Sequence, residues 1–429
     1  MKRLVLIVYS IIAATIAIDA QNKVFWVHGL NDNRSNIETS QVWYVYKHSL
    51  NDVDNQGRSL QWDGRYTINN ASADLNDIIN SDCTSSEQAI VIGHSAGGLV
   101  ARNAANSNPK IRAIVTAGTP NKGAGVVTAL KNGSAYNVAD RAIQKVSTAI
   151  VASSAAITVT FTGLSGLILT ICDLSDILIE KIGIALAKPK LDEYLTSFTS
   201  ELSVLDMDPD TTRNIFLRTL NSAPVTVPII NIYGNEDGNR LVRLAGTAMH
   251  KAEVDSYLNT SDKTYDDSAF KYYDGTIAVA TAAELLHATT AVAYGVAAVW
   301  NPSLAGSSAI NIAATVAWAD VRRFIQYDVR NEWDKMIGAY HIESVEKWHH
   351  FLWWKWSDVT EVLVYDDSDG FIPNSSSKMD NVVGPNIINR EVNGVNHLEM
   401  NSHPAMRSLL SQIFNGSYGD AFNPKKNVD

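Results

Sequence analysis

The segment Val91-Ile92-Gly93-His94-Ser95-Ala96-Gly97-Gly98-Leu99-Val100 decides how the rest of this sequence is interpreted. Residues 88–92 form an apolar run with the length of a buried strand, and residues 99–105 have the pattern of the first turns of a helix. Between them lies G-x-S-x-G, which fits a tight strand–turn–helix that holds its serine clear of the sheet. Gly93 and Gly97 suit such a turn because side chains at these positions would clash. Ser95, beside a helix N-terminus that favours negative charge, is therefore the candidate nucleophile.

The composition is that of a large globular protein. The chain has 429 residues, of which 46% are hydrophobic, and this is enough apolar material for one large core. The formal net charge of −10 gives a nucleic-acid-binding role no electrostatic basis, so we expect no nucleic-acid partner. The sequence contains neither a Gly-rich phosphate loop nor a dinucleotide motif and indicates no nucleotide cofactor.

The first twenty residues have the pattern of a secretory signal peptide. The basic pair Lys2-Arg3 precedes an apolar run over residues 4–18, and Ala20 is a small residue at a suitable cleavage position. We therefore expect a mature chain of residues 21–429 that is secreted or periplasmic. An uncleaved membrane anchor is the alternative, although the run is short for a bilayer span.

The chain has two cysteines, Cys83 and Cys172. In an oxidising compartment they can form a disulfide, and two buried free thiols are the alternative. Their number and spacing exclude a zinc site made from cysteines.

Short segments along the chain carry a family resemblance. They are His28-Gly29-Leu30, Gly93-His94-Ser95-Ala96-Gly97, Gly118-Thr119-Pro120-Asn121-Lys122-Gly123, Ser203–Pro209 with Phe216–Asn221, Ser368–Pro373 and Val395–Met400. In this order they resemble the secreted bacterial triacylglycerol lipases and related esterases of the α/β-hydrolase superfamily. The resemblance covers residues 22–125, 200–235 and 360–415 in approximate terms.

This resemblance implies an α/β-hydrolase fold with a mostly parallel central sheet, to which this sequence adds two helical insertions. It also implies hydrolysis of carboxylic esters, most readily lipid esters, through an acyl-serine intermediate. The partner is then an ester or lipid substrate at a lipid–water interface, and the chemistry needs no cofactor. We expect residues 21–429 to form a single domain.

The oxyanion hole is expected from two backbone N–H groups. Residues 23–27 read as a buried strand that ends in His28-Gly29-Leu30. In this superfamily the loop after such a strand supplies one N–H and the residue after the nucleophile supplies the other. These would be the backbones of Leu30 and Ala96. The alternative is an ordinary strand-to-turn glycine with His28 as a structural hydrogen-bonding residue.

The acid and base are expected on loops that follow two later strand-like runs, residues 359–365 and 386–392. His397 is the candidate base that takes the Ser95 proton, and a carboxylate would orient its imidazole. Asp369 is the preferred acid because Gly-Phe-Ile-Pro follows it, as in the family. The alternatives are Asp366, Asp367 and the Glu236-Asp237 pair as acid, and His403 as base. We expect His349-His350 to lie at the surface or in packing.

Glu399, two residues after His397, occupies a position at which the related lipases hold a structural calcium ion. A structural calcium site is therefore an open alternative, although the sequence offers no convincing partner carboxylate upstream. No other metal is expected.

Two insertions depart from the family pattern. The first spans about residues 126–222 and includes the uncharged stretch 146–172, for which we expect lid helices over the active site, with core helices or a membrane span as alternatives. The second spans about residues 239–358, has helical periodicity over 278–299 and 310–330, and ends in the tryptophan-rich run 348–356. We expect a helical cap with an aromatic core there, and a tryptophan rim at a lipid interface is the alternative.

The sequence therefore predicts a secreted carboxylic ester hydrolase with Ser95, His397 and Asp369 as its catalytic residues. Three other hypotheses remain open: an amidase or acyltransferase of the same fold, a catalytically inactive hydrolase-fold binding protein, and a membrane-embedded enzyme. We do not expect an integral membrane span.

Overall fold

The computed structural model describes residues 22–29, 59–60, 62, 67–134, 137, 141, 144–145, 148–149, 152, 206–210, 212–236, 240, 244, 264–380, 382, 384, 386–401 and 403–426. Several expectations lie outside these ranges: the signal peptide, Leu30, Cys172, Asp237 and most of the uncharged stretch 146–172. Within them, no helix combines the length and the apolar character that crossing a bilayer requires.

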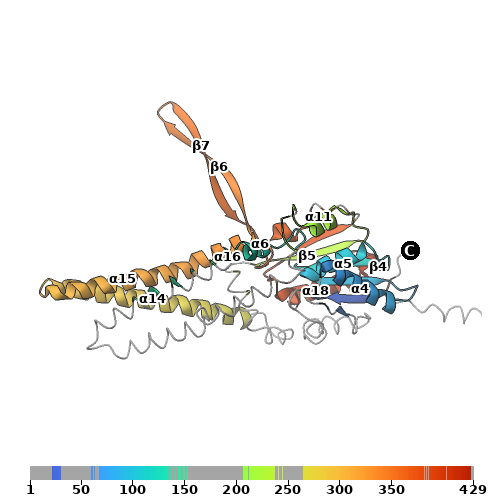
Figure 1. Ribbon diagram of the computed structural model, residues 1–429, viewed down its shortest axis with the longest axis horizontal. Coiled ribbons are helices and arrows are strands. Elements are labelled where there is room, and N and C mark those ends of the chain that lie inside the picture. Colours follow the sequence, from blue (N-terminus) through green and yellow to red (C-terminus); the bar gives the residue numbers. More distant parts are fainter. Residues whose placement is uncertain are drawn as a thin grey trace, which may run out of the picture.

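A parallel sheet forms the centre of the described part of the chain (Figure 1). Its strand order is β2-β1-β3-β4-β5-β8, and each neighbouring pair runs parallel. The expected mostly parallel central sheet is therefore confirmed. The strands are β1 (Lys23–Val27), β2 (Ser59–Leu60), β3 (Ala89–His94), β4 (Ile111–Ala117), β5 (Ile229–Asn235) and β8 (Ile387–Asn393).

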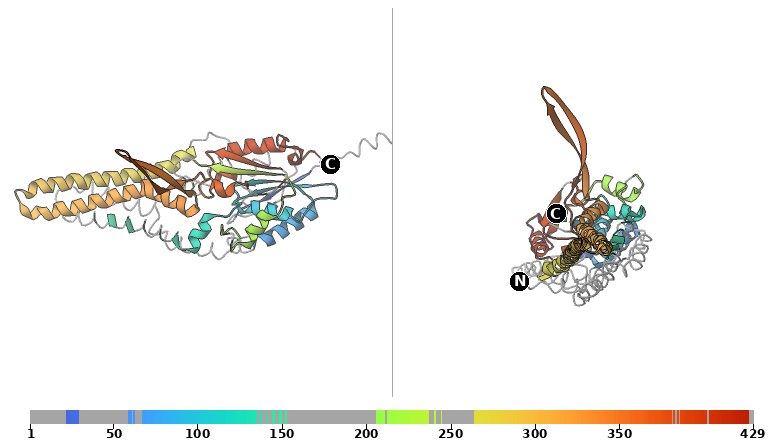
Figure 2. Two further views of the ribbon diagram at one scale, coloured as in Figure 1. Left: turned by 90° about the horizontal axis from the view of Figure 1, so that it is seen from above. Right: turned by 90° about the vertical axis from the view of Figure 1, so that its left-hand side faces the viewer.

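Helices cover both faces of the sheet, because its strands are apolar on both sides (Figure 2). In β1, Phe25 and Val27 belong to one hydrophobic core, whereas Val24 and Trp26 belong to the other. The first core is closed by α4 (Ile68–Asp82), α5 (Ala96–Ala105), α6 (Gly125–Lys131) and α11 (Ile215–Ser222). The second is closed by α18 (Pro404–Phe414) and the short helix η5 (Asp420–Phe422).

A pair of long helices projects from this body (Figure 1). They are α14 (Thr264–Ala298) and α15 (Ala305–Arg323), joined through η2 (Pro302–Leu304). Ala280, Ala283 and Trp318 pack between them, and Arg322 pairs with Glu284 at 2.8 Å. The chain then passes through a π-helical turn, η3 (Phe324–Asp328), into α16 (Val329–Ile337). The helical periodicity of the second insertion is thus confirmed.

The tryptophan-rich end of that insertion is not helical. Residues 340–365 form a two-stranded antiparallel hairpin of β6 (Tyr340–Phe351) and β7 (Trp354–Tyr365), and the expectation of a helical cap with an aromatic core is wrong here. The predicted strand over residues 359–365 exists, but it pairs with β6 and not with the central sheet. The reason is local: residues 340–365 are rich in β-branched and aromatic side chains, which favour an extended backbone.

The region between β1 and β3 also differs in part from expectation. The helix predicted over residues 71–79 is confirmed within α4. The strand predicted over residues 59–68 is limited to Ser59–Leu60 among the described residues, because Thr67 caps α4 by accepting the Asn70 N–H with its hydroxyl.

A buried ion pair joins α16 to the start of the second insertion, and its arginine also bonds to the chain that follows the insertion. Asp334 of α16 lies 3.3 Å from the guanidinium of Arg240, and both side chains are almost fully buried. The same Arg240 Nη1 donates to the carbonyl of Asp366 at 2.6 Å. Burial raises the pKa of Asp334, and the Arg240 guanidinium opposes that rise. Removing one partner would leave an uncompensated buried charge.

We predict that Asp334→Ala lowers the free energy of unfolding by about 3 kcal/mol, because the buried Arg240 would lose its buried counter-charge and keep only the exposed carboxylate of Asp367, 3.8 Å away. Urea denaturation measures this loss. The matched control is Asp320→Ala, whose half-exposed carboxylate pairs with Lys145 at 2.6 Å and should cost less than about 1 kcal/mol. Equal, small losses in both variants would contradict the stabilising role of the buried pair.

Candidate active site

Ser95 lies in the sharp turn between β3 and α5, as the motif predicts. Its backbone has φ 53° and ψ −128°, a conformation that non-glycine residues rarely adopt. The Ser95 N–H donates to the carbonyl of Ala117 in β4 at 2.8 Å, so the turn is tied to the neighbouring strand. The side chain is only partly buried, and its hydroxyl is therefore accessible at the carboxyl end of the sheet.

The glycines of the motif leave space that no side chain could share. A Cβ atom on Gly93 would lie 2.4 Å from the carbonyl oxygen of Gly97. A Cβ atom on Gly97 would lie 2.4 Å from the carbonyl oxygen of Val27 in β1. The expected crowding at both positions is confirmed, and the close approach brings the end of β1 next to the first turn of α5.

His397 lies within hydrogen-bond distance of Ser95. It follows β8 in the exit loop, where the sequence places it, and its Nε2 is 3.0 Å from Ser95 Oγ. Its backbone N–H donates to the carbonyl of Asp369 at 2.7 Å. This backbone bond fixes the histidine loop against the loop that carries the carboxylate.

Asp369 lies on the other side of the imidazole from Ser95, so that Ser95, His397 and Asp369 form a hydrogen-bonded row. Its Oδ2 lies 2.8 Å from His397 Nδ1, and the carboxylate is buried. Its Oδ1 accepts the backbone N–H groups of Phe371 at 2.9 Å and Ile372 at 2.6 Å. With both oxygens occupied, the carboxylate has one orientation, and it holds the imidazole with the Nδ1 proton towards itself and Nε2 towards the serine.

Asp369 lies at the end of β5 in space, although the second insertion separates the two in sequence. The backbone N–H of Glu236, just after β5, donates to the carbonyl of Ser368 at 2.8 Å. On the other side of β5, the N–H of Gly394 donates to the carbonyl of Asn235 at 2.8 Å. The strand that orders the acid loop is therefore β5. The run 359–365, expected to be the strand that precedes the acid, lies in the hairpin.

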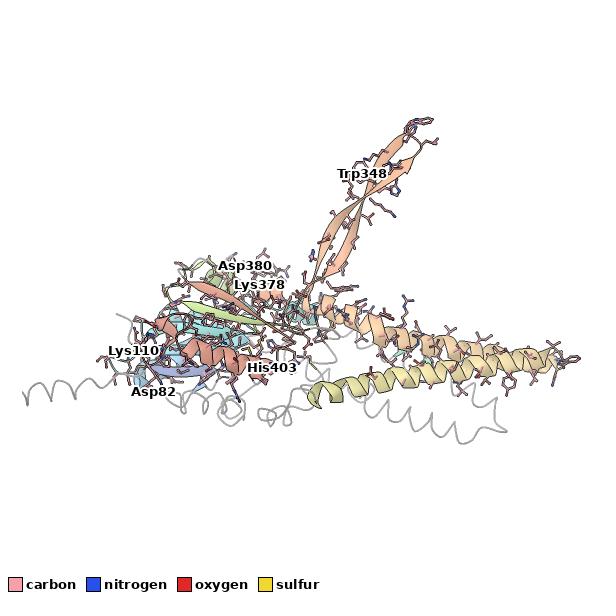
Figure 3. All side chains as sticks on the ribbon, turned by 180° about the vertical axis from the view of Figure 1, so that it is seen from behind. Asp82, Lys110, Trp348, Lys378, Asp380 and His403 are labelled. Carbon is pink, nitrogen blue, oxygen red and sulfur yellow. The ribbon has the colours of Figure 1, made fainter. Side chains whose placement is uncertain are left out.

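The alternative acids and bases have other contacts. Asp366 Oδ1 lies 2.7 Å from His341 Nδ1, and the side chain of Asp367 is largely exposed. His403 caps α18 by accepting the Ala405 N–H, and Figure 3 shows it at that helix. His349 is on the β6–β7 hairpin. Glu236 is buried, and Asp237 lies outside the described residues.

The two expected oxyanion donors can be placed only in part. Ala96 is the first residue of α5, and the first N–H groups of a helix have no partner within that helix. Gly29 lies beside the serine, since a Cβ atom on it would be 2.8 Å from Ser95 Cβ. The loop after β1 therefore reaches Ser95, while Leu30 itself lies outside the described residues.

Three neighbours of the imidazole were not singled out as site residues by the sequence. The rings of Phe371 and His94 are centred 5.2 Å and 5.1 Å from that of His397, and His94 Nε2 lies 3.0 Å from the carbonyl of His397. Gly118, at φ 59°, leaves room for the pair, since a Cβ there would be 3.0 Å from His397 Nδ1 and 3.2 Å from Asp369 Oδ2. All three belong to the motifs quoted above, which was the available signal.

The end of α11 is held to α5 by hydrogen bonds of a buried arginine. Arg102 of α5 donates to the side-chain oxygens of Asn121 at 2.8 Å and Asn221 at 2.9 Å. No carboxylate accompanies this guanidinium in these bonds, and burial lowers the pKa of Arg102 to about 10. The three side chains join the helix after Ser95 to the loop after β4 and to the end of α11.

The calcium site left open at Glu399 finds no group of ligands among the described residues. Its carboxylate is buried and accepts the backbone N–H of Asn396 at 3.1 Å, within its own loop. In the described part of the chain, no three carboxylate, histidine or cysteine side chains are grouped so that they could hold a metal ion.

Comparison with known proteins concerns the amino-terminal part of the chain. A family model described as a PGAP1-like alpha/beta domain matches residues 12–180, which include Ser95 but neither Asp369 nor His397. No curated protein sequence matches this chain. Together with the sheet order and the turn at Ser95, the family match confirms the expected α/β-hydrolase-type domain.

Several solved structures match parts of this chain at low TM-scores. The mature lipase BlEst2 of Bacillus licheniformis is 13% identical, with 55% of this chain and 74% of that chain covered at a TM-score of 0.30. The metagenomic carboxyl esterase MGS0156 is 10% identical, with 54% and 56% covered at a TM-score of 0.30. An epoxide hydrolase of Bacillus megaterium is 18% identical, with 50% and 77% covered at a TM-score of 0.23.

We predict that Gly97→Ala lowers the free energy of unfolding by about 3 kcal/mol or more, because the new methyl group would meet the backbone of Val27 and His28. Urea denaturation is again the measurement. Gly306→Ala is the control: a Cβ atom at this helical position has no neighbour within 4 Å, so stability should rise by up to about 1 kcal/mol. An unchanged stability of Gly97→Ala would contradict the crowding at the turn.

Proposed function

We propose that this protein is a serine hydrolase that cleaves carboxylic esters through an acyl-serine intermediate. The observation that carries the proposal is the row Ser95 Oγ–His397 Nε2, His397 Nδ1–Asp369 Oδ2, with contacts of 3.0 Å and 2.8 Å. A strained serine beside a helix N-terminus adds support, since backbone strain of this kind concentrates at functional sites.

In the first half of the reaction, Ser95 Oγ attacks the ester carbonyl carbon while His397 Nε2 takes the hydroxyl proton. The carbonyl oxygen becomes an oxyanion, which the N–H of Ala96 and one from the loop after β1, expected at Leu30, would stabilise. The bond between the carbonyl carbon and the alcohol oxygen then breaks. The alcohol leaves with the proton held by His397, and the acyl group remains on Ser95.

In the second half, a water molecule attacks the acyl carbon and gives a proton to His397. The carboxylic acid departs, and the proton returns to Ser95 Oγ. Throughout, Asp369 accepts the Nδ1 proton as a hydrogen bond and stabilises the imidazolium without becoming protonated itself. Because Oδ1 is held by two backbone N–H groups, rotation of the carboxylate away from His397 would break both bonds.

The finer parts of the proposal concern substrate and location. The sequence resemblance to triacylglycerol lipases supports a lipid ester as substrate. The basic and apolar pattern of residues 1–20 supports export to the periplasm or beyond. An amidase or acyltransferase of the same fold would use the same row of residues, and comparing p-nitroanilides with p-nitrophenyl esters, and an added alcohol with water as acyl acceptor, separates these cases.

We predict that Ser95→Ala abolishes ester hydrolysis while the fold is preserved, because the row loses its nucleophile. The loss in kcat should be on the order of 10⁶. The measurement is hydrolysis of p-nitrophenyl esters of increasing acyl length by the parent and the variant, with labelling by a fluorophosphonate probe as a second readout. Unchanged turnover would refute Ser95 as the nucleophile, and a parent protein that takes no label would indicate an inactive scaffold.

Asp369→Asn should lower kcat by about 10⁴, because the imidazole loses both its orientation and its counter-charge. The control is Asp366→Asn, three residues away, whose carboxylate contacts His341 and should leave kcat essentially unchanged. Steady-state kinetics on one short ester compare the two. Should Asp366→Asn be the damaging change and Asp369→Asn the harmless one, the acid is wrongly assigned.

A further inference from the structure

The β6–β7 hairpin projects away from the other described elements. Figures 1 and 3 show it leaving the body at the end of α16, and Trp348, labelled in Figure 3, lies on the part remote from the body. Each strand has twelve residues, and among the described residues the two strands pair only with each other. An isolated two-stranded ribbon is only marginally stable in water. A hairpin of this length that packs on no other described element is therefore expected to contact a second surface.

The far end of this hairpin, residues 347–356, which we call the hairpin tip, exposes large apolar side chains. In the turn, Leu352 is 76% exposed and Trp353 is 82% exposed. Trp354, at the start of β7, is 67% exposed. Single exposed apolar residues are ordinary, but a contiguous exposed group of this size marks an interaction site.

The tryptophans occur on both faces of the ribbon. Because neighbouring residues of a strand point to opposite faces, Trp348 and its cross-strand partner Ser357 lie on one face, whereas Trp356 and its partner His349 lie on the other. The ring stacking of His349 on Trp356, with centroids 5.3 Å apart, agrees with this arrangement. A protein partner that packs against one face would leave the other aromatic face in water. A lipid interface surrounds the inserted end on all sides.

The charges of the hairpin are sorted along its length. The tip carries Lys347 and Lys355 and no acidic residue. Asp358 lies at the inner limit of the tip, where it is the cross-strand partner of Lys347 and its Oδ2 is 3.2 Å from His349 Nε2. The other acidic residues of both strands lie closer to the body: Glu343, Glu346 and Glu361. In a chain with a net charge of −10, this places a basic, aromatic end at the point farthest along the ribbon.

One contact shows how the tip combines these features. The ammonium group of Lys355 lies 4.6 Å from the centre of the Trp348 ring, a cation–π arrangement. Tryptophan rings prefer the headgroup level of a bilayer, where one part of the ring is apolar and the N–H remains hydrated. Lysines at the same depth meet the phosphate groups of anionic lipids.

We infer that the hairpin tip binds the surface of a lipid bilayer that contains anionic lipids. Leu352, Trp353 and Trp354 enter the interfacial layer, and Lys347 and Lys355 contact lipid phosphates. This binding does not depend on the ester chemistry proposed above. If that chemistry holds, the consequence is that the enzyme works on lipids of the bilayer to which it is docked.

The base of the hairpin connects this surface to the candidate active site. The N–H of Asp366, just after β7, donates to the carbonyl of Ala339 at 2.9 Å, and Asp369 follows three residues later. Trp333 of α16 donates its indole N–H to the carbonyl of Gly370 at 2.7 Å. The tip is therefore connected, through the base of the hairpin and through α16, to the loop that carries Asp369.

The test is flotation of the mature Ser95→Ala protein, residues 21–429, with vesicles. This protein lacks the apolar run of residues 4–18, and no lipid can be consumed by Ser95. We expect binding about tenfold tighter to vesicles that mix phosphatidylglycerol with phosphatidylcholine than to phosphatidylcholine alone, and weakening by added salt. The double variant Trp353→Ser/Trp354→Ser should bind at least about tenfold more weakly. Lys347→Glu/Lys355→Glu should remove the preference for phosphatidylglycerol.

Ile342→Ser is the matched control, because Ile342 lies on the same hairpin close to the body and is 60% exposed. It should bind vesicles like the parent. Melting temperatures of all variants should match, since the altered side chains are exposed. A readout that needs no hairpin variant is quenching of the tryptophan fluorescence of the Ser95→Ala protein by brominated phospholipid, which should be partial, since other tryptophans remain in the body.

Equal binding of parent and tryptophan double variant, or the absence of quenching, would overturn the inference. So would a loss of binding in Trp300→Ser, at the end of the α14–α15 pair, with the hairpin variants unaffected. Concentration-dependent dimers in sedimentation, abolished by the double variant and accompanied by no vesicle binding, would assign the tip to a second copy of the chain. Failure of ester hydrolysis by the parent would leave the flotation result standing.

Discussion

The close approach of β1 to the first turn of α5 is the constraint on which this site depends. The carbonyl oxygens of Val27 and His28 occupy the space where a side chain on residue 97 would lie. The same turn carries Ser95 with its positive φ, places Gly29 against the Ser95 side chain, and begins α5 at Ala96. A nucleophile and a developing negative charge require neighbours of this kind. The loops that carry His397 and Asp369 come to Ser95 from the ends of β8 and β5.

The order of the row is kept by backbone bonds more than by side chains. His397 and Asp369 are joined both by their side chains and by the N–H of His397, and Asp369 is held by two further N–H groups of its own turn. Gly118 supplies the space. Buried polar groups without partners are costly, so a set in which each member is satisfied by backbone resists rearrangement.

How much of this could be predicted from the sequence depended on how local each signal was. The turn at Ser95 needs only ten consecutive residues, and Asp369 and His397 stand in short motifs at the ends of strand-like runs, so these residues could be named in advance. The run 359–365 could not be separated from the central sheet in advance, because β5, the strand that orders the acid loop, meets that loop only through contacts distant in sequence. The hairpin was mistaken for helical packing because tryptophans are usually buried, and no local rule says that Trp353 and Trp354 are not.

The hydrogen bond between Glu236 and Ser368 joins the two ends of the long segment inserted between β5 and the acid loop. The polypeptide leaves the sheet after β5 and returns to the same point, so the connectivity of the sheet would be the same if a short turn replaced everything between. The long helices and the ribbon thus belong to an inserted segment whose two ends lie side by side at the end of β5. Lineages can lengthen, shorten or exchange such a segment without refolding the body, because loop closure costs rise only slowly with length. The reach of the protein and the chemistry of its sheet are therefore free to change independently.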